Sequence, residues 1–323
     1  MPYNSIITRA DATDLIPDET SREIIKGVAE MNPLMNLARR LPNIPTSQRT
    51  MPVQSALATA YFVNGDTGLK QTSGLDWANV SITAEELAVI VPVPEAVLDD
   101  ADYDIWGETK PALTEAFSVA ITEAVLYGTN IPPSWTVNLG AAGLFARATA
   151  AGHVVSRANY ADLYEATLAE TNANVPGLLM TLEADGFMST GHVASAAMRG
   201  RLRNVRDING VPIFTRSMQD STRYELDGAP IYFPTDGSIV DATSWMFTGD
   251  WQQLVYAFRQ DITYKILQEA VIQDAAGNIV YNLAQQDMVA LRAVMRLGFA
   301  LPNPINRMQA VAANRLPFAV LTA

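Results

Sequence analysis

Hydrophobic residues near the start of the chain follow a helical period that prolines interrupt. In DETSREIIKGVAEMNPL (18–34), Ile24, Val28 and Met31 recur on one face. Prolines stand at positions 2, 17, 33, 42 and 45, and a proline stops a helix from extending. We therefore predict an extended arm that carries one helix of about three turns and that lies across a neighbouring molecule.

From position 49 to position 93 the pattern changes to a period of two. TMPVQSALATAYFVN (50–64) and LDWANVSITAEELAVIVPVP (75–94) are rich in Val, Ile, Thr and aromatic residues, as strands are. GDTGLKQTSG between them is typical of a hairpin tip. With about 15 residues in each arm, the predicted hairpin reaches roughly 50 Å at about 3.3 Å per residue. Because so long a hairpin cannot bury both faces within its own domain, we expect a partner to cover it.

The helical period returns in IWGETKPALTEAFSVAITEAVLYGTN (105–130). Leu113, Phe117 and Ile121 are spaced to share one face, and Gly128 is a natural helix stop. Counted from Ile105, the helix has about 23 residues and a length of roughly 35 Å. Pro111 lies two turns in, so either the helix bends there or it begins near position 109.

The rest of the chain mixes short periods. Between 131 and 240 the pattern predicts helices over YADLYEATLAETNA (160–173) and ASAAMRGRLRNVRD (194–207), and strands over GLLMT (177–181), VPIF (211–214) and APIYFP (229–234). This mixture indicates a compact α/β or α+β lobe. Beyond 241 strands dominate, in SWMFTGDWQQLVYAFRQDITYKILQEA and QDMVALRAVMRLGFAL.

Composition narrows the possible functions. The 323 residues are 49% hydrophobic but only 17% charged, with a net charge of −12. So little surface charge suggests that the protein hides surface against copies of itself. The acidic balance disfavours binding to nucleic-acid phosphates and to anionic membranes. The chain has no cysteine, which excludes disulfides and thiolate metal sites, and no apolar run approaches the 18 or more residues, roughly, of a membrane-spanning helix.

The acidic stretch DDADYDIWGE (99–108) is the most conspicuous candidate for a metal site. A calcium loop that begins at Asp100 needs a glycine at its sixth position and a glutamate at its twelfth, but these positions hold Ile105 and Pro111. Carboxylates also occur where helices begin, because they accept hydrogen bonds from free N–H groups. We therefore expect Asp102 or Asp104 to cap the long helix, with a weak surface cation site as the alternative.

Other catalytic patterns are weak. His153 and His192 are the only histidines, and no G-x-S-x-G, H-E-x-x-H or phosphate-loop pattern accompanies them. A pair of carboxylates for glycoside hydrolysis remains possible among 34 acids. Arg199, Arg203 and Arg206 share a predicted helix face. Because aromatic residues are not interleaved with them, we expect these arginines to be solvated or to pair with acids of a neighbouring subunit rather than to bind nucleic acid.

Three stretches in order carry a resemblance to a known family. They are the acid-rich entry and long helix VPVPEAVLDDADYDIWGETKPALTEAFSVAITEAVLYG, the segment GDWQQLVYAFRQDITYKILQEA and the segment MVALRAVMRLGFALPNP. With the proline-broken arm and the hairpin, they make the chain resemble the Hong Kong 97-like major capsid protein of tailed bacteriophages.

The resemblance implies an α+β fold of the Hong Kong 97-like type. It implies six segments: an N-terminal arm (1–46), an extended-loop hairpin (47–86), a peripheral domain with the spine helix (87–130), an axial domain (131–240), closing strands shared by both domains (241–300) and a C-terminal return to the axial domain (301–323).

The same resemblance implies a structural protein without enzymatic activity or cofactor. It would form hexamers and pentamers of an icosahedral shell around double-stranded DNA, in a virion assembled in the cytoplasm of a bacterial host. Partners would be a portal and a separate scaffolding protein, since this chain opens at Met1 directly in the arm. A decoration protein is an optional further partner. The candidates for inter-subunit contact are Lys70, Trp77, Arg199, Arg203 and Arg206.

One departure from the family pattern concerns covalent cross-linking. Some relatives join subunits through an isopeptide bond between a lysine of the extended loop and an asparagine, with the help of a glutamate. Lys70 could be the lysine, but Asp287 stands at the asparagine position and Val294 at the glutamate position. We therefore expect a shell without isopeptide bonds, held by noncovalent contacts.

Two other functions remain as alternatives. An encapsulin-type bacterial compartment has the same fold and encloses protein cargo. A soluble acidic hydrolase with paired carboxylates would form a small particle, and it would leave the arm and the hairpin unexplained.

Overall fold

The computed structural model describes residues 32–63, 68–100, 105–168, 171–172, 175–206, 224–274 and 276–323. Several predicted features lie outside these residues: nearly all of the arm helix, the capping aspartates at 102 and 104, and the strand predicted at 211–214. The first described helix is the short α3 (Pro33–Leu37), which Asn32 caps by accepting from the backbone N–H groups of Leu34 and Met35.

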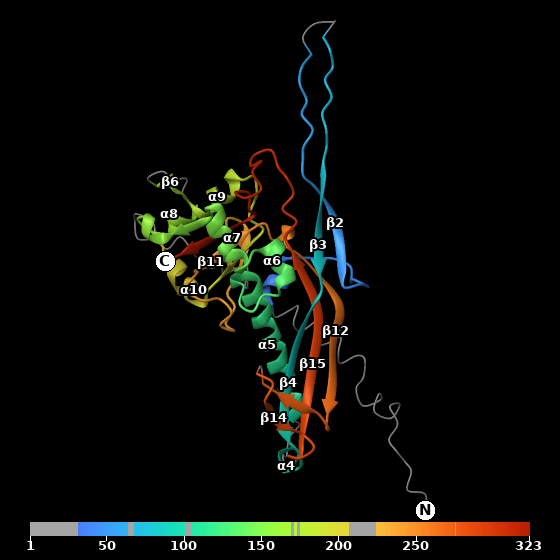
Figure 1. Ribbon diagram of the computed structural model, residues 1–323. Helices are drawn as coiled ribbons and strands as arrows, with labels where there is room; N and C mark the ends of the chain where they lie inside the picture. The colour runs from blue at the N-terminus through green and yellow to red at the C-terminus, as the bar shows by residue number, and fades with distance from the viewer. Residues whose placement is uncertain are drawn as a thin grey trace, which may run out of the picture.

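A four-stranded sheet, which we call the long sheet, forms one half of the molecule (Figure 1). Its order is β1 (Arg39–Arg40), β12 (Val255–Leu267), β15 (Met288–Ala300) and β4 (Glu85–Pro94). β1 is parallel to β12, and the other pairs are antiparallel. The strands predicted in the last third of the chain are confirmed here, and β15 lies at the centre because both neighbours pair along nearly its whole length.

The long helix α5 (Ile105–Tyr127) runs beside the long sheet (Figure 1). Leu113, Phe117 and Ile121 are buried in one core cluster with side chains of β12 and β15. The helix begins at Ile105, after the short helix α4 (Glu95–Asp100), and Pro111 is accommodated inside it. It ends at Gly128, whose φ of +72° is a backbone conformation that glycine adopts at little cost.

The other half is a lobe around a six-stranded sheet, the lobe sheet. Its order is β5 (Val154–Ser156), β16 (Phe318–Thr322), β11 (Met246–Gly249), β8 (Gly191–Ala194), β10 (Ala229–Tyr232) and β9 (Tyr224–Leu226). The accompanying helices are α6 (Pro133–Leu139), α7 (Gly143–Ala151), α8 (Leu163–Leu168), α9 (Leu178–Ala184) and α10 (Ala196–Arg203). The C-terminal strand β16 thus returns to the interior of a sheet built mostly from the middle of the chain.

Short elements complete the described residues. They are the 3-10 turns η1 (Arg157–Asn159) and η2 (Trp251–Gln253) and the strand pairs β6 (Thr171–Asn172) with β7 (Val175–Pro176), β13 (Val271–Gln273) with β14 (Ile279–Asn282), and β2 (Gln48–Gln54) with β3 (Trp77–Thr83). No helix within these described ranges is long and apolar enough to cross a bilayer.

The strand predicted over GLLMT is wrong, because these residues begin helix α9. Leu178 and Leu182 are both fully buried and are four residues apart, the spacing of one helix face. The hydroxyl of Thr181 donates to the carbonyl of Gly177, four residues earlier, at 2.8 Å. A five-residue apolar window cannot separate a buried strand from a buried helix, and this window stopped just before Leu182.

Two other predicted elements are shorter than expected. The helix predicted over 160–173 is confined to α8, and residues 171–172 pair with β7 as a short strand. The paired part of the hairpin ends at Gln54 and Trp77, well before the tip. Residues 55–63 and 68–76 carry no strand assignment.

His192 is fully buried at the centre of the lobe sheet. One ring nitrogen, Nε2, lies 3.1 Å from the Leu226 carbonyl, and Nδ1 lies 2.7 Å from the Thr248 hydroxyl. The neutral tautomer with its proton on Nε2 satisfies both contacts, because it donates to the carbonyl and accepts from the hydroxyl. Burial disfavours the charged imidazolium and lowers the pKa of His192 to about 4.

This histidine predicts a loss of stability in acid. Its folded pKa of about 4 lies below the ordinary histidine value of 6.5, so the unfolded chain binds the proton first as the pH falls. The free energy of unfolding should drop by about 3 kcal/mol between roughly pH 6.5 and pH 4, at about 1.4 kcal/mol per pKa unit. Urea unfolding at several pH values checks this, with His192→Gln as control, since its amide keeps a donor and an acceptor but does not titrate. Parallel curves for the two proteins would contradict the assignment.

Candidate functional site

The hairpin is the feature that the rest of the molecule leaves uncovered. β2 and β3 pair in register from Gln48 with Thr83 to Gln54 with Trp77. Beyond them the two segments continue side by side and project away from both sheets (Figure 1). A few contacts join them there: the Thr59 N–H donates to the Ser73 hydroxyl at 2.8 Å, and the Tyr61 hydroxyl donates to a backbone carbonyl of the facing segment at 3.1 Å.

Large apolar side chains are displayed along this projection. Phe62 is fully exposed, Leu69 is 88% exposed and Trp77 is 66% exposed, and Leu75 is also exposed. Single exposed apolar residues are ordinary, but four on one narrow projection form a surface that another molecule is expected to cover. Two of the expected contact residues, Lys70 and Trp77, lie on this projection and are exposed.

The root of the hairpin is held firmly. The indole Nε1 of Trp135 donates to the Thr83 carbonyl at 3.0 Å, and the Asn138 amide donates to the Ser81 carbonyl at 2.7 Å. Gly298 of β15 passes so close that a Cβ there would lie 2.5 Å from the Thr83 carbonyl oxygen. Helix α6 and β15 therefore set the direction in which the hairpin leaves the body.

A second brace comes from the segment between β15 and β16. The backbone N–H of Ile305 donates to the Gln54 carbonyl at 3.2 Å, and the guanidinium of Arg307 donates to the Ala58 carbonyl. Asp185 holds the same segment to the lobe, since its carboxylate accepts from the Leu316 N–H at 3.1 Å and lies 3.2 Å from His153 Nε2. The lobe and the hairpin root are thus joined through one connecting segment.

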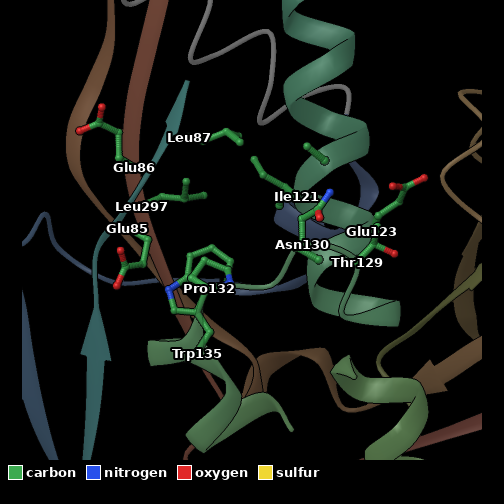
Figure 2. A pocket seen from close by; sticks show the side chains of 12 residues that line it. Glu85, Glu86, Leu87, Ile121, Glu123, Thr129, Asn130, Pro132, Trp135 and Leu297 are labelled. Atoms are coloured by element: carbon green, nitrogen blue, oxygen red, sulfur yellow. The ribbon is translucent and has the colours of Figure 1, made fainter. Parts of the chain in front are cut away.

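A cavity of about 210 Å³ opens at this root, between β4, α5 and α6 (Figure 2). Its interior is lined by apolar side chains, among them Leu87, Ile121, Trp135 and Leu297. Three carboxylates also line it: Glu85, Glu86 and Glu123. The site therefore combines an apolar interior with negative charge. We call it the root cavity.

Arg199 and Arg203 lie four residues apart on α10 as expected, but Arg206 does not share their helix face. The helix ends at Arg203, so Arg206 lies beyond it and the predicted spacing is wrong for this residue. The guanidinium of Arg199 stacks over the Tyr224 ring at 4.7 Å, and Arg203 Nε donates to the Arg199 carbonyl at 3.3 Å. Asn204 in the C-cap position closes the helix one residue past Arg203, which is why the periodicity stops there.

The arginine with the clearest structural role is Arg201, which the helical pattern did not single out. It makes two hydrogen bonds to the Asp241 carboxylate, of 2.6 and 2.8 Å, and lies 3.9 Å over the Trp245 ring. The bond to Arg201 lowers the pKa of Asp241 to about 2, so the carboxylate is ionised at neutral pH. No sequence signal pointed to this pair, because its members are 40 residues apart.

The positions relevant to cross-linking lie in and beside β15. Asp287 precedes the strand with a φ of +47°, and its carbonyl accepts from the Glu95 N–H at 2.9 Å. Val294 is buried within the strand and faces Ala88 of β4. Asp287 has no side-chain amide, and Val294 has no carboxylate.

The acidic stretch provides no metal site within the described residues. Asp99 is exposed on α4, and α5 begins at Ile105. No group of three or more His, Asp or Glu side chains in the described part of the chain is placed to hold a metal ion. Both histidines are buried and contact backbone carbonyls, His153 that of Phe318 at 3.0 Å.

Comparison with known proteins gives a consistent picture. The model of the phage capsid family matches residues 12–308. The chain is 26% identical over 284 residues to the major capsid protein of Staphylococcus phage 80alpha, covering 87% of this chain and 79% of that protein. Solved structures from Microbacterium phage Oxtober96 (30% identity, TM-score 0.74, 98% of this chain and 99% of that chain) and Mycobacterium phage Adephagia (28%, 0.74, 98% of each chain) are similar throughout.

Proposed function

This chain belongs to the phage capsid family, and on that premise we propose that it builds the hexamers and pentamers of an icosahedral head that encloses double-stranded DNA. It is a major capsid protein with the Hong Kong 97-like fold, a component of the virion. The encapsulin alternative is not favoured, because the relatives are phage capsid proteins.

The hairpin is the single observation that carries the proposal. It projects from the body with exposed apolar residues along its length (Figure 1), and burying them against another subunit would stabilise an assembly. An isolated monomer gains nothing from such an element and risks aggregation through it. The proposal therefore treats the hairpin as one half of a subunit contact.

We assign the two halves of the molecule to the two places in a capsomer. The long sheet with α5 is the peripheral domain, and the lobe sheet with its helices is the axial domain. The first 46 residues are the arm. β12 begins where the two halves meet, and β15 ends there. This is in keeping with closing strands that both halves share.

The charge of the subunit is compatible with DNA as the contents of the shell. A subunit with a net charge of −12 repels phosphate groups overall, which suits a wall that does not bind the enclosed DNA tightly. We propose no catalytic activity and no cofactor. The partners we propose are a separate scaffolding protein and a portal, with a decoration protein as an optional addition, and assembly takes place in the cytoplasm of the bacterial host.

We also propose that noncovalent contacts alone hold the shell. An isopeptide bond forms between a lysine amine and an amide carbon with loss of ammonia, and Asp287 offers a carboxylate where that amide would stand. Val294 cannot take the part of a proton-accepting glutamate. Lys70 is therefore an ordinary polar residue of the hairpin in this respect.

One preparation tests these statements together. The purified chain, with scaffold candidates added, should give hexamers, pentamers or closed shells in negative-stain electron microscopy. On a denaturing gel the particles should give a single band at 35.0 kDa, with no ladder of linked subunits. A monomer at high concentration under all these conditions would contradict the capsid assembly, whereas shells that give a ladder would contradict only the absence of cross-links.

A further inference from the structure

The two ends of the hairpin carry complementary chemistry. At the root, the root cavity combines apolar walls with carboxylates. Near the tip, an apolar residue and a cationic residue are adjacent in sequence, Leu69 and Lys70, and both are exposed. An apolar cavity with an acidic rim suits a ligand that has an apolar group beside a cation. The apolar group is buried in the cavity, while the cation remains near its mouth.

The carboxylates of the root cavity are only partly engaged within the subunit. Glu86 pairs with Arg296 of β15 at 2.6 Å. Glu85 accepts a hydrogen bond from the Ser134 hydroxyl at 2.6 Å, which leaves its charge uncompensated. Neither Glu85 nor Glu123 takes part in a salt bridge within the described residues. Two residues whose carboxylates have no salt-bridge partner among the described side chains therefore line the cavity, and they lie on opposite sides of it (Figure 2).

The cavity interior accepts an aliphatic side chain. Leu87, Ile121, Trp135 and Leu297 come from four different elements, so the walls are held by the long sheet, α5 and α6 together. A volume of about 210 Å³ is enough for one leucine side chain. Burial of Leu69 in the cavity would contribute a large hydrophobic free energy, because its side chain is 88% exposed to water in the isolated subunit.

These two ends cannot meet in one molecule. Leu69 lies 14 residues before Thr83, which is at the root, so an extended arm separates them by roughly 45 Å at about 3.3 Å per residue. The root is fixed by Trp135 and Asn138, and the arm points away from the body (Figure 1). A contact between tip and root cavity therefore joins two copies of the chain.

We propose that Leu69 of one subunit occupies the root cavity of the next, with Lys70 paired to Glu123 at its mouth. The inference rests on the proposed function and adds the receiving site of the hairpin. Because the contact uses different surfaces on the two partners, it repeats head to tail and closes into a ring when the rotation permits. The same contact serves rings of five and six subunits, because the weakly paired outer hairpin can bend to fit the different rotation between neighbouring subunits.

Because the chain has no cysteine, any disulfide in an engineered variant must form between the introduced thiols. The variant Leu69→Cys/Ala120→Cys places one thiol on the tip and one in the root cavity lining. Oxidised particles should show intersubunit ladders on a non-reducing gel. The matched control is Leu69→Cys/Ile279→Cys, whose second position is more exposed than Ala120 but lies on β14. We expect about tenfold more linked subunits in the first variant, because a disulfide needs Cα atoms within about 7 Å.

A charge exchange gives an independent measurement. Lys70→Glu and Glu123→Lys should each lower the yield of particles, and the double variant should recover much of it because the pair is restored in reverse. If the wild-type chain forms particles, the inference would be overturned by Leu69→Cys/Ala120→Cys particles with no excess of cross-links over the Leu69→Cys/Ile279→Cys control, or by a charge-exchanged double variant no better than either single one. Either result would leave the proposed function standing. Absence of wild-type particles would instead overturn both.

Discussion

Replacing residues 55–76 with an Asn-Gly turn is expected to leave a folded subunit that forms no closed shell. Gln54 and Trp77 are register partners at the last paired rung of β2 and β3, so a two-residue turn can join them without disturbing the root. The variant loses most of the exposed apolar side chains of the hairpin, and these contribute nothing to the stability of the isolated subunit. The expected change is thus nearly complete loss of assembly with little change in the melting temperature.

Circular dichroism melting and electron microscopy of the same preparation check this expectation. A useful control keeps the hairpin at full length and replaces only Phe62 with Ser. This control should assemble less well than wild type but better than the shortened protein, because only one of the exposed apolar residues is lost. Normal shells from the shortened protein would show that assembly does not depend on the hairpin.

Trp251→Ala is expected to remove about 4 kcal/mol from the free energy of unfolding, the range for truncating a buried tryptophan. Trp251 is fully buried, and its ring packs edge to face on Phe318 with centroids 5.0 Å apart. Its Nε1 donates to the Gly191 carbonyl at 2.9 Å, so truncation leaves both a cavity and an unsatisfied buried acceptor. Urea unfolding of the unassembled subunit measures the loss.

Trp77→Ala is the matched control, since the same side chain is removed from a position that is 66% exposed. It should change the free energy of unfolding by about 0.5 kcal/mol or less, while lowering the yield of particles. Equal destabilisation by the two substitutions would contradict the burial that the structure assigns to Trp251.

The environment of Trp251 explains the Gly-Asp-Trp stretch that helped to carry the family resemblance. Gly249 is the last residue of β11, and a side chain there would collide with the Pro317 carbonyl and the Phe318 ring. Asp250 caps the following turn by accepting from the Gln252 N–H at 3.2 Å. The chain can therefore turn from the lobe sheet into β12 with Trp251 inserted between the two. The sequence alone identified these residues as a motif but did not explain their structural roles.

Long, strongly periodic segments were predictable because their stability depends on their own pattern. The helix α5 repeats buried residues every four positions and ends at a glycine that takes a positive φ. β12 and β15 have 13 residues each, long enough for a strand pattern to stand out. The prediction failed where the window was short, as in GLLMT, because a few apolar residues fit a strand and a helix equally well.

The sequence by itself determined the long helix, the presence of a hairpin, the strands in the last third of the chain and the resemblance to a capsid family, since each is recorded in local periodicity or in a contiguous motif. Only the tertiary structure brought Arg201 to Asp241, placed Asp185 beside His153, and gathered Glu85, Glu123 and Trp135 around one cavity. These groups come from segments distant in sequence, and nothing in a local pattern records which distant segment will lie beside it. The contacts of the hairpin root, which set its direction, depend on such long-range packing. The alternating pattern was enough to predict the paired part of the hairpin, but residues 55–63 and 68–76 form no strand although the sequence predicted one.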